Sequence, residues 1–280
     1  MSNKPAIGFF GGDQRQVSMA QTFLQMEYSI LSYKMAASNS HENYKELHSL
    51  KELCQACQYL IGPIPLTNSE FSVLDLANSL TNKNILIGGV IPSDLADSCN
   101  QKGILYYDLM KNEKVAILNS IATAEGTIME AIRNSDINLH GSNCLVLGYG
   151  RCGKVLSQKL KGMNASVTVG ARSDEMLAFA EASGHQTIHL SDINVVLPNY
   201  DFIFNTIPAM VLDQKKLELV KQNVTIIDIA SSPGGIDYKF ALQENMKAKL
   251  FPGLPGKVSP KTSADILVNE IITLMKEGIR

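Results

Sequence analysis

Short apolar runs alternate with amphipathic segments along the whole chain. The apolar runs predict buried strands, and the spacing of apolar positions between them predicts helices such as Glu70–Leu80. In the first half of the chain the expected strands are Ala6–Gly11, Ser29–Lys34, Tyr59–Gly62, Ile85–Gly89 and Ile104–Tyr107. This β-α-β-α order is typical of a parallel sheet that is covered by helices on both faces.

A second series of the same kind begins at Cys144. Its expected strands are Cys144–Leu147, Ser166–Gly170, Asp201–Asn205, Val224–Ile229 and Lys249–Phe251, with a weaker one at Gln186–His189. A polar turn cluster at Asn138–Asn143 separates the two series and indicates a domain boundary. The predicted fold class is therefore α/β, with two doubly wound parallel-sheet domains.

We expect residues 1–138 to form a flavodoxin-like substrate domain and residues 139–261 to form a Rossmann dinucleotide-binding domain. A linking helix, Ile121–Asn134, and the final helical segment, residues 262–280, are assigned to the first domain. The final segment follows a Pro/Gly stretch and is expected to pack back on the first domain. Since ligands bind such sheets at the carboxyl ends of the strands, we expect an active cleft between the domains.

Composition narrows the classes of function. The chain has 280 residues, of which 45% are hydrophobic and 19% are charged, with a net charge of −2. Such a balance gives no basic stripe for nucleic acid, and no apolar run approaches the roughly 18 residues of a membrane span. Neither a secretory signal nor a disulfide framework is indicated, so we expect a reduced, cytoplasmic protein. Cys54 and Cys57 have redox or zinc spacing, but no second pair or nearby His follows, and no metal is expected.

One motif carries specific chemistry. The residues Gly148, Tyr149, Gly150, Arg151, Cys152 and Gly153 form a G-x-G-x-x-G sequence between an apolar strand and an amphipathic helix. The first glycine permits the tight turn, the second lets a pyrophosphate approach the backbone, and the third lets helix and strand pack closely. The sequence predicts dinucleotide binding here; the alternative is a glycine-rich turn that holds no ligand.

The end of the following strand bears on the choice of dinucleotide. NAD enzymes usually place Asp or Glu there, to bind the ribose 2′-hydroxyl. This chain instead has Arg172 and Ser173, and a guanidinium can bind a 2′-phosphate through two parallel hydrogen bonds. We therefore predict NADP as cofactor, with Ser173 as a hydroxyl donor. The alternative is that Arg172 stacks on adenine or faces solvent.

Two later strand ends are expected to complete the cofactor site. Asn205, Thr206, Ile207 and Pro208 follow one buried strand, and Ala230 and Ser231 follow the next. The first turn is expected beside the nicotinamide ribose. Turn chemistry alone would also explain the Pro and Gly residues in these segments.

Several motifs together resemble a known family. They are Gly11-Gly12-Asp13-x-Arg15, Thr123–Gly126, Leu147–Lys154, Asp228–Gly235 and Gly253–Thr262. In combination they resemble the A subunit of dipicolinate synthase from spore-forming bacteria, over nearly the whole chain. More distantly, the second domain resembles those of 2-hydroxyacid and alanine dehydrogenases.

The resemblance implies a role in sporulation. It implies NADP-dependent oxidation of a dihydrodipicolinate or hydroxytetrahydrodipicolinate precursor to dipicolinate, in the cytoplasm of the mother cell. The flavoprotein-like B subunit of dipicolinate synthase is the implied partner. A homodimer is only the default expectation for the oligomeric state.

A substrate with two carboxylates calls for cations or helix N-termini. We expect Arg15 to bind one carboxylate, with Gly12 and Asp13 beside it. Lys257, Lys261 and Thr262, around the loop after the last strand, are the other candidates. The alternatives are an Arg15–Asp13 ion pair and solvated loop lysines.

The sequence names no clear catalytic base. Glu125, expected in the first turn of the linking helix, is the one candidate, although interaction with the helix dipole would explain the same position. The five histidines are expected at the surface, with His41 and His48 on a polar helix. Because the product is aromatic, water could accept the proton. Two other functions stay open: a different hydroxy-acid or amino-acid dehydrogenase, and a non-catalytic NADP-binding scaffold for the flavoprotein.

Overall fold

The computed structural model describes residues 4–37, 39–67 and 70–277 and divides into two compact units. Unit 1 comprises Met1–Asn119 and Ser259–Arg280, and unit 2 comprises Ser120–Val258. The sequence predicted the boundary at the turn cluster, residues 138–143. In the structure the boundary lies earlier, between Asn119 and Ser120. The whole of the expected linking helix, Ile121–Asn134, therefore groups with unit 2 rather than with the first domain.

Unit 1 contains a parallel sheet. Its strands, over the described residues, are β1 Ile7–Phe10, β2 Ile30–Tyr33, β3 Tyr44–Glu46, β4 Tyr59–Ile61, β5 Ile85–Gly88 and β6 Leu105–Asp108, in the order β3-β2-β1-β4-β5-β6. Without β3 this is the 2-1-3-4-5 order expected for a flavodoxin-like sheet. The short edge strand β3 lies where the sequence predicted a polar helix, and it changes the order to that of a Rossmann sheet.

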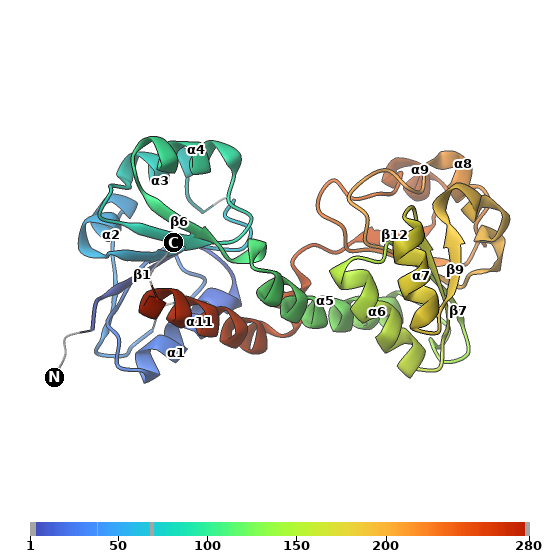
Figure 1. Ribbon diagram of the computed structural model, residues 1–280, viewed down its shortest axis with the longest axis horizontal. Helices are drawn as coiled ribbons and strands as arrows, with labels where there is room; N and C mark the ends of the chain where they lie inside the picture. The colour runs from blue at the N-terminus through green and yellow to red at the C-terminus, as the bar shows by residue number, and fades with distance from the viewer. Residues whose placement is uncertain (1–3, 38, 68–69, 278–280) are drawn as a thin grey trace. The chain divides into compact units, whose positions relative to one another are not determined.

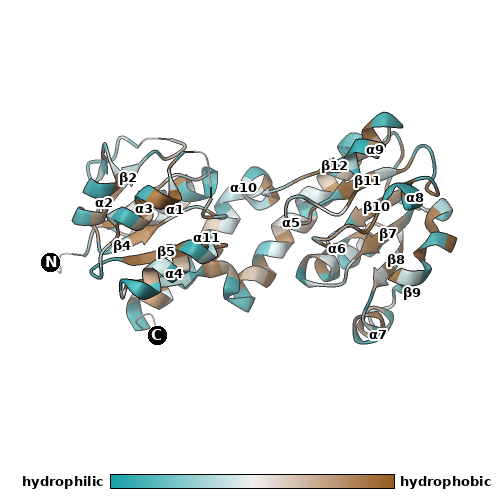
Figure 2. Cartoon of the chain, turned by 90° about the horizontal axis from the view of Figure 1, so that it is seen from above, coloured by the Kyte–Doolittle hydropathy of each residue, from teal (hydrophilic) through white to brown (hydrophobic). Residues whose placement is uncertain are grey.

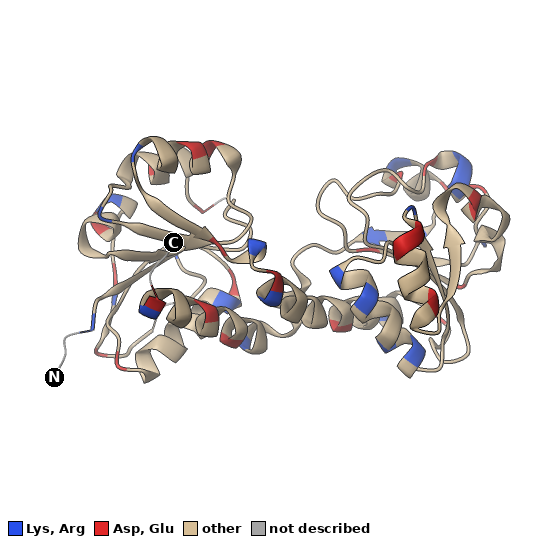
Figure 3. Ribbon diagram, in the orientation of Figure 1, with Lys and Arg blue, Asp and Glu red and all other residues tan. Residues whose placement is uncertain are grey.

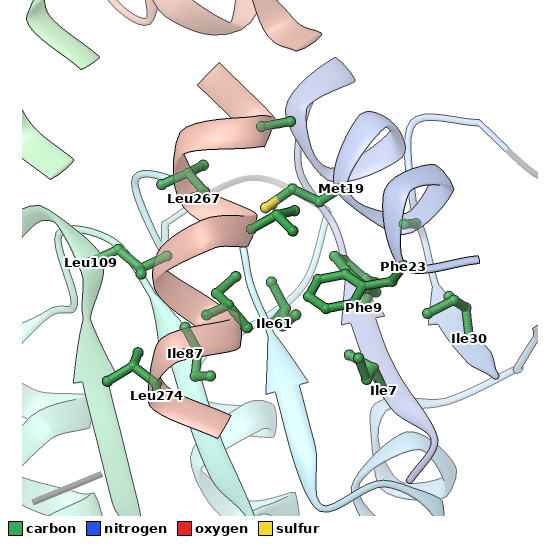
Figure 4. Close-up of a cluster of buried hydrophobic side chains, with 14 of the residues drawn as sticks. Ile7, Phe9, Met19, Phe23, Ile30, Ile61, Ile87, Leu109, Leu267 and Leu274 are labelled. Atoms are coloured by element: carbon green, nitrogen blue, oxygen red, sulfur yellow. The ribbon is translucent and has the colours of Figure 1, made fainter. Parts of the chain in front are cut away.

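Helices cover both faces of this sheet (Figure 1). One face carries α1 Gln14–Gln25 and α11 Pro260–Glu277, which pack against each other. The remaining helical segments are α2 Leu50–Ala56, α3 Val73–Ser79, α4 Ser93–Gln101 and the 3₁₀ turn η1 Leu109–Lys111. Figure 4 shows Leu267 and Leu274 of α11 in one buried cluster with Met19, Ile61 and Ile87. Each such side chain contributes about 1.5–3 kcal/mol on burial, so α11 is an integral part of unit 1. The prediction that the C-terminal helix returns to the first domain is confirmed.

The linking helix α5, Glu113–Asn134, is longer than the expected Ile121–Asn134. Its length and apolar composition alone would suit a membrane span, but half of its most apolar window is buried within the protein. Ala124, Ile128 and Ala131 lie in the core of unit 2. A helix with one buried stripe is typical of a protein core.

Unit 2 contains the second parallel sheet. Its strands are β7 Asn143–Leu147, β8 Ser166–Ala171, β9 Gln186–His189, β10 Phe202–Asn205, β11 Thr225–Asp228 and β12 Lys247–Leu250, in the order β12-β11-β10-β7-β8-β9. Counted within the unit, this is the Rossmann order 3-2-1-4-5-6. The weak strand at Gln186–His189 is real, because it pairs with β8. Apolar strands form the centre of both sheets (Figure 2).

The helical segments of unit 2 follow its strands. They are α6 Arg151–Gly162, α7 Asp174–Ala182, η2 Leu190–Val195, η3 Leu197–Asn199, α8 Gln214–Leu217, α9 Tyr238–Gln243 and α10 Leu254–Val258. The segment Phe251–Lys261, expected as a loop, thus contains α10, and α11 already begins at Pro260. The fold class predicted from sequence, two doubly wound α/β units of which the second is Rossmann-like, is confirmed.

Candidate cofactor site

The three glycines after β7 have three distinct environments. Gly148 has a φ of +96°, and a Cβ atom there would collide with the hydroxyl of Thr206. A Cβ atom on Gly153 would collide with the carbonyl oxygen of Gly148, whereas one on Gly150 would meet nothing within 4 Å among the described residues. The first and third glycines are therefore required by the fold. The second leaves open space above the backbone, where a pyrophosphate could approach.

Helix α6 begins at this open space. Gly150 is its N-cap, and no side chain in the described part of the chain caps the first turn. Backbone N–H groups at such a helix start favour an anionic ligand. Cys152 lies in the same turn, and burial raises the pKa of its thiol more than Arg151 and a hydrogen bond with Thr123 lower it. It is therefore a neutral thiol, and does not oppose an anion.

Tyr149 contributes to this turn through its backbone. Its side chain is buried beneath Lys154, whose Nζ lies 5.8 Å from the ring centroid, and packs edge-on against His185 at 6.1 Å. His185 itself is buried, and its two ring nitrogens have no hydrogen-bond partner within the described chain. The expectation that His185 lies at the surface is wrong, because the turn before β9 folds it under Tyr149.

The turn after β10 is held by its own side chains. The Asn205 amide donates to the carbonyl of Ile207 at 3.0 Å and accepts from the Ile207 N–H at 3.1 Å. The hydroxyl of Thr206 donates to the carbonyl of Leu147 at 2.9 Å. These bonds fix the residues that lead to Pro208 next to the glycine turn. In this arrangement Asn205 and Thr206 shape the site, and their hydrogen-bonding groups are engaged within the protein.

Arg172 follows directly after β8 and lines a cavity of about 180 Å³. The other lining residues are Leu190, Ile193, Ile207, Ala209, Met210, Val211 and Lys216. Ser173 is the N-cap of α7, and its hydroxyl oxygen accepts from the Met176 N–H at 3.4 Å. Lys216 was missed by the sequence reasoning, since only the fold brings it to this cavity.

A second missed feature holds the loop after β11. The carboxylate of Asp228 is fully buried and accepts from the N–H groups of Ala230 and Gly235, at 2.8 and 2.7 Å. The hydroxyl of Tyr238 donates to it at 2.6 Å. Burial and the adjacent Asp228 charge raise the pKa of Tyr238 far above its usual range, so its hydroxyl stays protonated. The loop that bears Ala230 and Ser231 is thereby fixed at both ends.

In unit 1, the predicted carboxylate site has its donors engaged. The Arg15 guanidinium is buried, donates to both carboxylate oxygens of Asp13, and reaches the carbonyl of Ile64 at 2.5 Å. The N–H of Gly12 donates to the Glu70 carboxylate at 3.0 Å. The arrangement is the Arg15–Asp13 ion pair that the sequence left open as the alternative. It ties the start of α1 to the loop after β4.

The remaining candidates lie on helices. Lys257 is exposed on α10, and Lys261 and Thr262 are exposed in the first turn of α11. Lys261 lies 3.4 Å from the carboxylate of Asp265. Glu125 lies in the middle of α5, not in a first turn, and pairs with Lys159 at 2.8 Å. The helix-dipole explanation for Glu125 therefore does not apply.

The cysteine pair belongs to the core. Cys54 and Cys57 are buried, and burial raises the pKa of their thiols to about 11 and about 12. Within the described part of the chain, no cluster of His, Cys, Asp or Glu is arranged to hold a metal ion.

Comparison with known proteins matches the two parts of the chain to two known domain families. Residues 6–110 match the model of the N-terminal domain of the dipicolinate synthase A subunit, and residues 104–249 match the NAD-binding domain of D-isomer-specific 2-hydroxyacid dehydrogenases. The second match gives the chain a nicotinamide-dinucleotide-binding domain. The apo structure of D-lactate dehydrogenase from Escherichia coli superposes with a TM-score of 0.66 at 12% identity, over 98% of each chain, which concerns the fold alone.

Closer relatives share both units. The dipicolinate synthase A subunit of Bacillus subtilis (strain 168) is 38% identical over 193 residues, which are 69% of this chain and 65%, just under two thirds, of that protein. The crystal structure of the dipicolinate synthase A subunit from Bacillus halodurans superposes with a TM-score of 0.88 at 30% identity, over 97% of each chain. The corresponding Bacillus subtilis crystal structure gives 0.84 at 30% identity, over 99% of this chain and 97% of that one. The chain therefore belongs to the family of dipicolinate synthase A subunits.

Proposed function

We propose that this chain binds NADP in unit 2 and oxidises a cyclic dicarboxylate precursor to dipicolinate. The observation that carries the proposal is the open space at Gly150. The glycines on either side of it, Gly148 and Gly153, have no room for a Cβ atom. Arg172 supports the choice of NADP, because it lines the neighbouring cavity and is an exposed cation at the position where NAD enzymes carry a carboxylate.

The residues of unit 2 fit this cofactor. The N–H groups at the start of α6 would hold the pyrophosphate, and Arg172 with Ser173 would bind the 2′-phosphate. The turn at Asn205–Pro208 and the loop at Ala230 and Ser231 would line the nicotinamide side. The bound cofactor supplies a hydride acceptor at nicotinamide C4.

The proposed reaction on dihydrodipicolinate is a two-electron oxidation. One ring C–H bond breaks, its hydride leaves for the cofactor, and one further proton is released as the ring becomes aromatic. We propose that water accepts this proton, because formation of the aromatic ring lowers the energy of losing it and no strong base is needed. The hydroxytetrahydro precursor would also have to lose water before the same step.

For the substrate carboxylates we favour the exposed cations Lys257 and Lys261, with Thr262 as a hydroxyl donor. Arg15 would act indirectly, since its guanidinium is buried and holds Asp13 and the carbonyl of Ile64. We further propose that the protein works in the mother-cell cytoplasm of a spore-forming bacterium. There it would act with the flavoprotein-like B subunit of dipicolinate synthase, as a homodimer or within a larger assembly.

The test combines the purified chain, NADP and freshly generated precursor, with and without the flavoprotein-like partner. NADPH and a pyridine chromophore should appear together, in equal amounts. A Gly150→Ala variant should abolish both signals. If the chromophore forms equally well with this variant and the partner, without NADPH, the chain is a scaffold and not the oxidant. If a hydroxy acid or an amino acid is oxidised in place of the precursor, the substrate assignment is wrong.

A further inference from the structure

A second cation lines the cavity beside Arg172. Lys216 and Arg172 both contribute to the wall of the same cavity of about 180 Å³, although 44 positions of the sequence, from 172 to 216, separate them. We propose that Lys216 binds the 2′-phosphate of NADP together with Arg172 and so determines the preference for NADP over NAD. This inference rests on the proposed function of unit 2.

The fold fixes the place of Lys216. It lies on the short helix α8, whose buried Leu217 packs into the core of unit 2. Asp213 caps this helix and accepts from the Lys216 N–H at 3.1 Å. Figure 3 shows basic residues on α8, which are Lys215 and Lys216. Of these two lysines, only Lys216 lines the cavity.

The charges around the cavity favour an anion. Asp174 and Glu175, the carboxylates closest in sequence to Arg172, do not line it. The carboxylate that touches Lys216 is Asp213, at 3.2 Å. Burial raises the pKa of Asp213, but the hydrogen bonds and charge of Lys216 outweigh this effect and hold the pKa below its ordinary value.

The Asp213–Lys216 pair does not prevent phosphate binding. The Asp213 side chain is 47% exposed, and such surface pairs contribute little to stability. A phosphate dianion placed between two cations is a stronger partner than one exposed carboxylate. Lys216 can therefore contact the phosphate at little cost, either sharing or leaving Asp213.

The other residues that line the cavity indicate which chemical group is attached to the bound phosphate. Leu190, Ile193, Ile207 and Met210 are apolar, so the cavity suits a flat apolar group next to a phosphate. Adenosine with a phosphate on its 2′-oxygen has this chemistry. Inorganic phosphate alone would make no contact with these apolar side chains.

The test uses adenosine 2′,5′-bisphosphate and adenosine 5′-monophosphate as probes, titrated calorimetrically into the purified two-unit chain. The two probes differ only in the 2′-phosphate. Lys216→Ala should weaken binding of the bisphosphate about tenfold or more and change binding of the monophosphate less than twofold. Lys216→Arg should restore most of the loss. Lys215→Ala is the matched control on the same helix and should change neither affinity.

Each other outcome is informative. If Lys216→Ala lowers the affinity for both probes equally and leaves the Tm unchanged, Lys216 does not bind the 2′-phosphate. Unchanged bisphosphate affinity would also overturn the inference, while NADP binding by the wild-type protein would leave the proposed function standing. If the wild-type protein binds neither probe nor NADP, the inference and the proposed function fail together.

Discussion

The Nε2 atom of His189 lies 2.9 Å from the carbonyl oxygen of Arg172. A carbonyl only accepts, so Nε2 carries the proton and Nδ1 is the acceptor for Ser191, whose N–H lies at 3.2 Å. The imidazole thus joins the start of η2 to the residue that follows β8. Arg172 lines the cavity from a backbone that is held in place by a neighbouring strand.

His189→Phe should loosen this loop without emptying the space that the ring fills. We expect NADP affinity to fall about three- to tenfold, since one neutral hydrogen bond is worth about 0.5–1.5 kcal/mol. NAD affinity should change less, because the guanidinium is required only for the 2′-phosphate. Calorimetric titration measures both. A variant that binds NADP as tightly as the wild-type protein would show that the loop needs no such anchor.

The two later glycines of the motif should respond differently to alanine. Gly150→Ala should fold normally, since its Cβ atom meets nothing within 4 Å, but the methyl group should block the pyrophosphate. Gly153→Ala should lower the Tm, because its Cβ atom collides with the Gly148 carbonyl. Circular dichroism melts and NADP titrations separate the two effects. Tight NADP binding by Gly150→Ala would place the ligand elsewhere.

His185 should make stability depend on pH. Burial and, secondarily, Lys161 hold its pKa below the ordinary 6.5, so the unfolded chain binds a proton more readily than the folded one. The contribution of neutral, buried His185 to the free energy of unfolding is fully present above pH 6.5. It is lost as the pH falls through the lowered pKa, and the free energy of unfolding then falls by up to about 1.4 kcal/mol per pH unit.

His185→Phe removes this group and keeps an aromatic contact with Tyr149. Between pH 7 and about 5, urea unfolding should show a shallower loss of stability in this variant than in the wild-type protein. The exposed His140 provides the control, and His140→Gln should leave the wild-type slope unchanged. Parallel slopes for His185→Phe and wild type would contradict the assigned burial.

Tyr238→Phe should destabilise unit 2. It removes the 2.6 Å hydrogen bond to a fully buried carboxylate, and such bonds are worth about 1.5–3 kcal/mol. The matched control is Tyr106→Phe, at a half-buried tyrosine of unit 1, which should change stability by about 0.5 kcal/mol or less. Denaturant unfolding measures the loss of stability in each variant. Equal losses would mean that the hydrogen bond from Tyr238 to Asp228 does not stabilise unit 2 beyond an ordinary tyrosine hydroxyl.

The sequence predicted most of the fold because most strands of both sheets, the central ones above all, are apolar runs of the right length. It missed β3, whose residues are polar and largely exposed at the sheet edge. It missed α10, since Leu-Pro-Gly-Lys-Val has the composition of a turn. Short edge strands and single-turn helices depend on tertiary contacts, which local pattern does not encode.

The candidate site likewise contains residues that local sequence spacing predicts and residues that only the fold brings together. The glycine motif and Arg172 follow from local spacing, so they could be read from the sequence. His189 joins the end of β9 to the residue after β8, Tyr238 of α9 bonds the end of β11, and Lys216 of α8 lines the same cavity as Arg172. No motif in the sequence signals these placements. For Arg15, the nearby Asp13 already suggested the observed ion pair, but only the fold could show that its guanidinium is buried against the Ile64 carbonyl.

The most direct measurement of the central claim is a side-by-side titration of the wild-type protein, Arg172→Ala and Arg133→Ala with NADP and NAD. Arg133 is an exposed arginine of the same unit, outside the cavity, and serves as the control. We predict that wild type and Arg133→Ala bind NADP more tightly than NAD, and that Arg172→Ala loses about ten- to hundredfold in NADP affinity and little in NAD affinity. Equal losses for both nucleotides, or no binding of either by the wild-type protein, would contradict it.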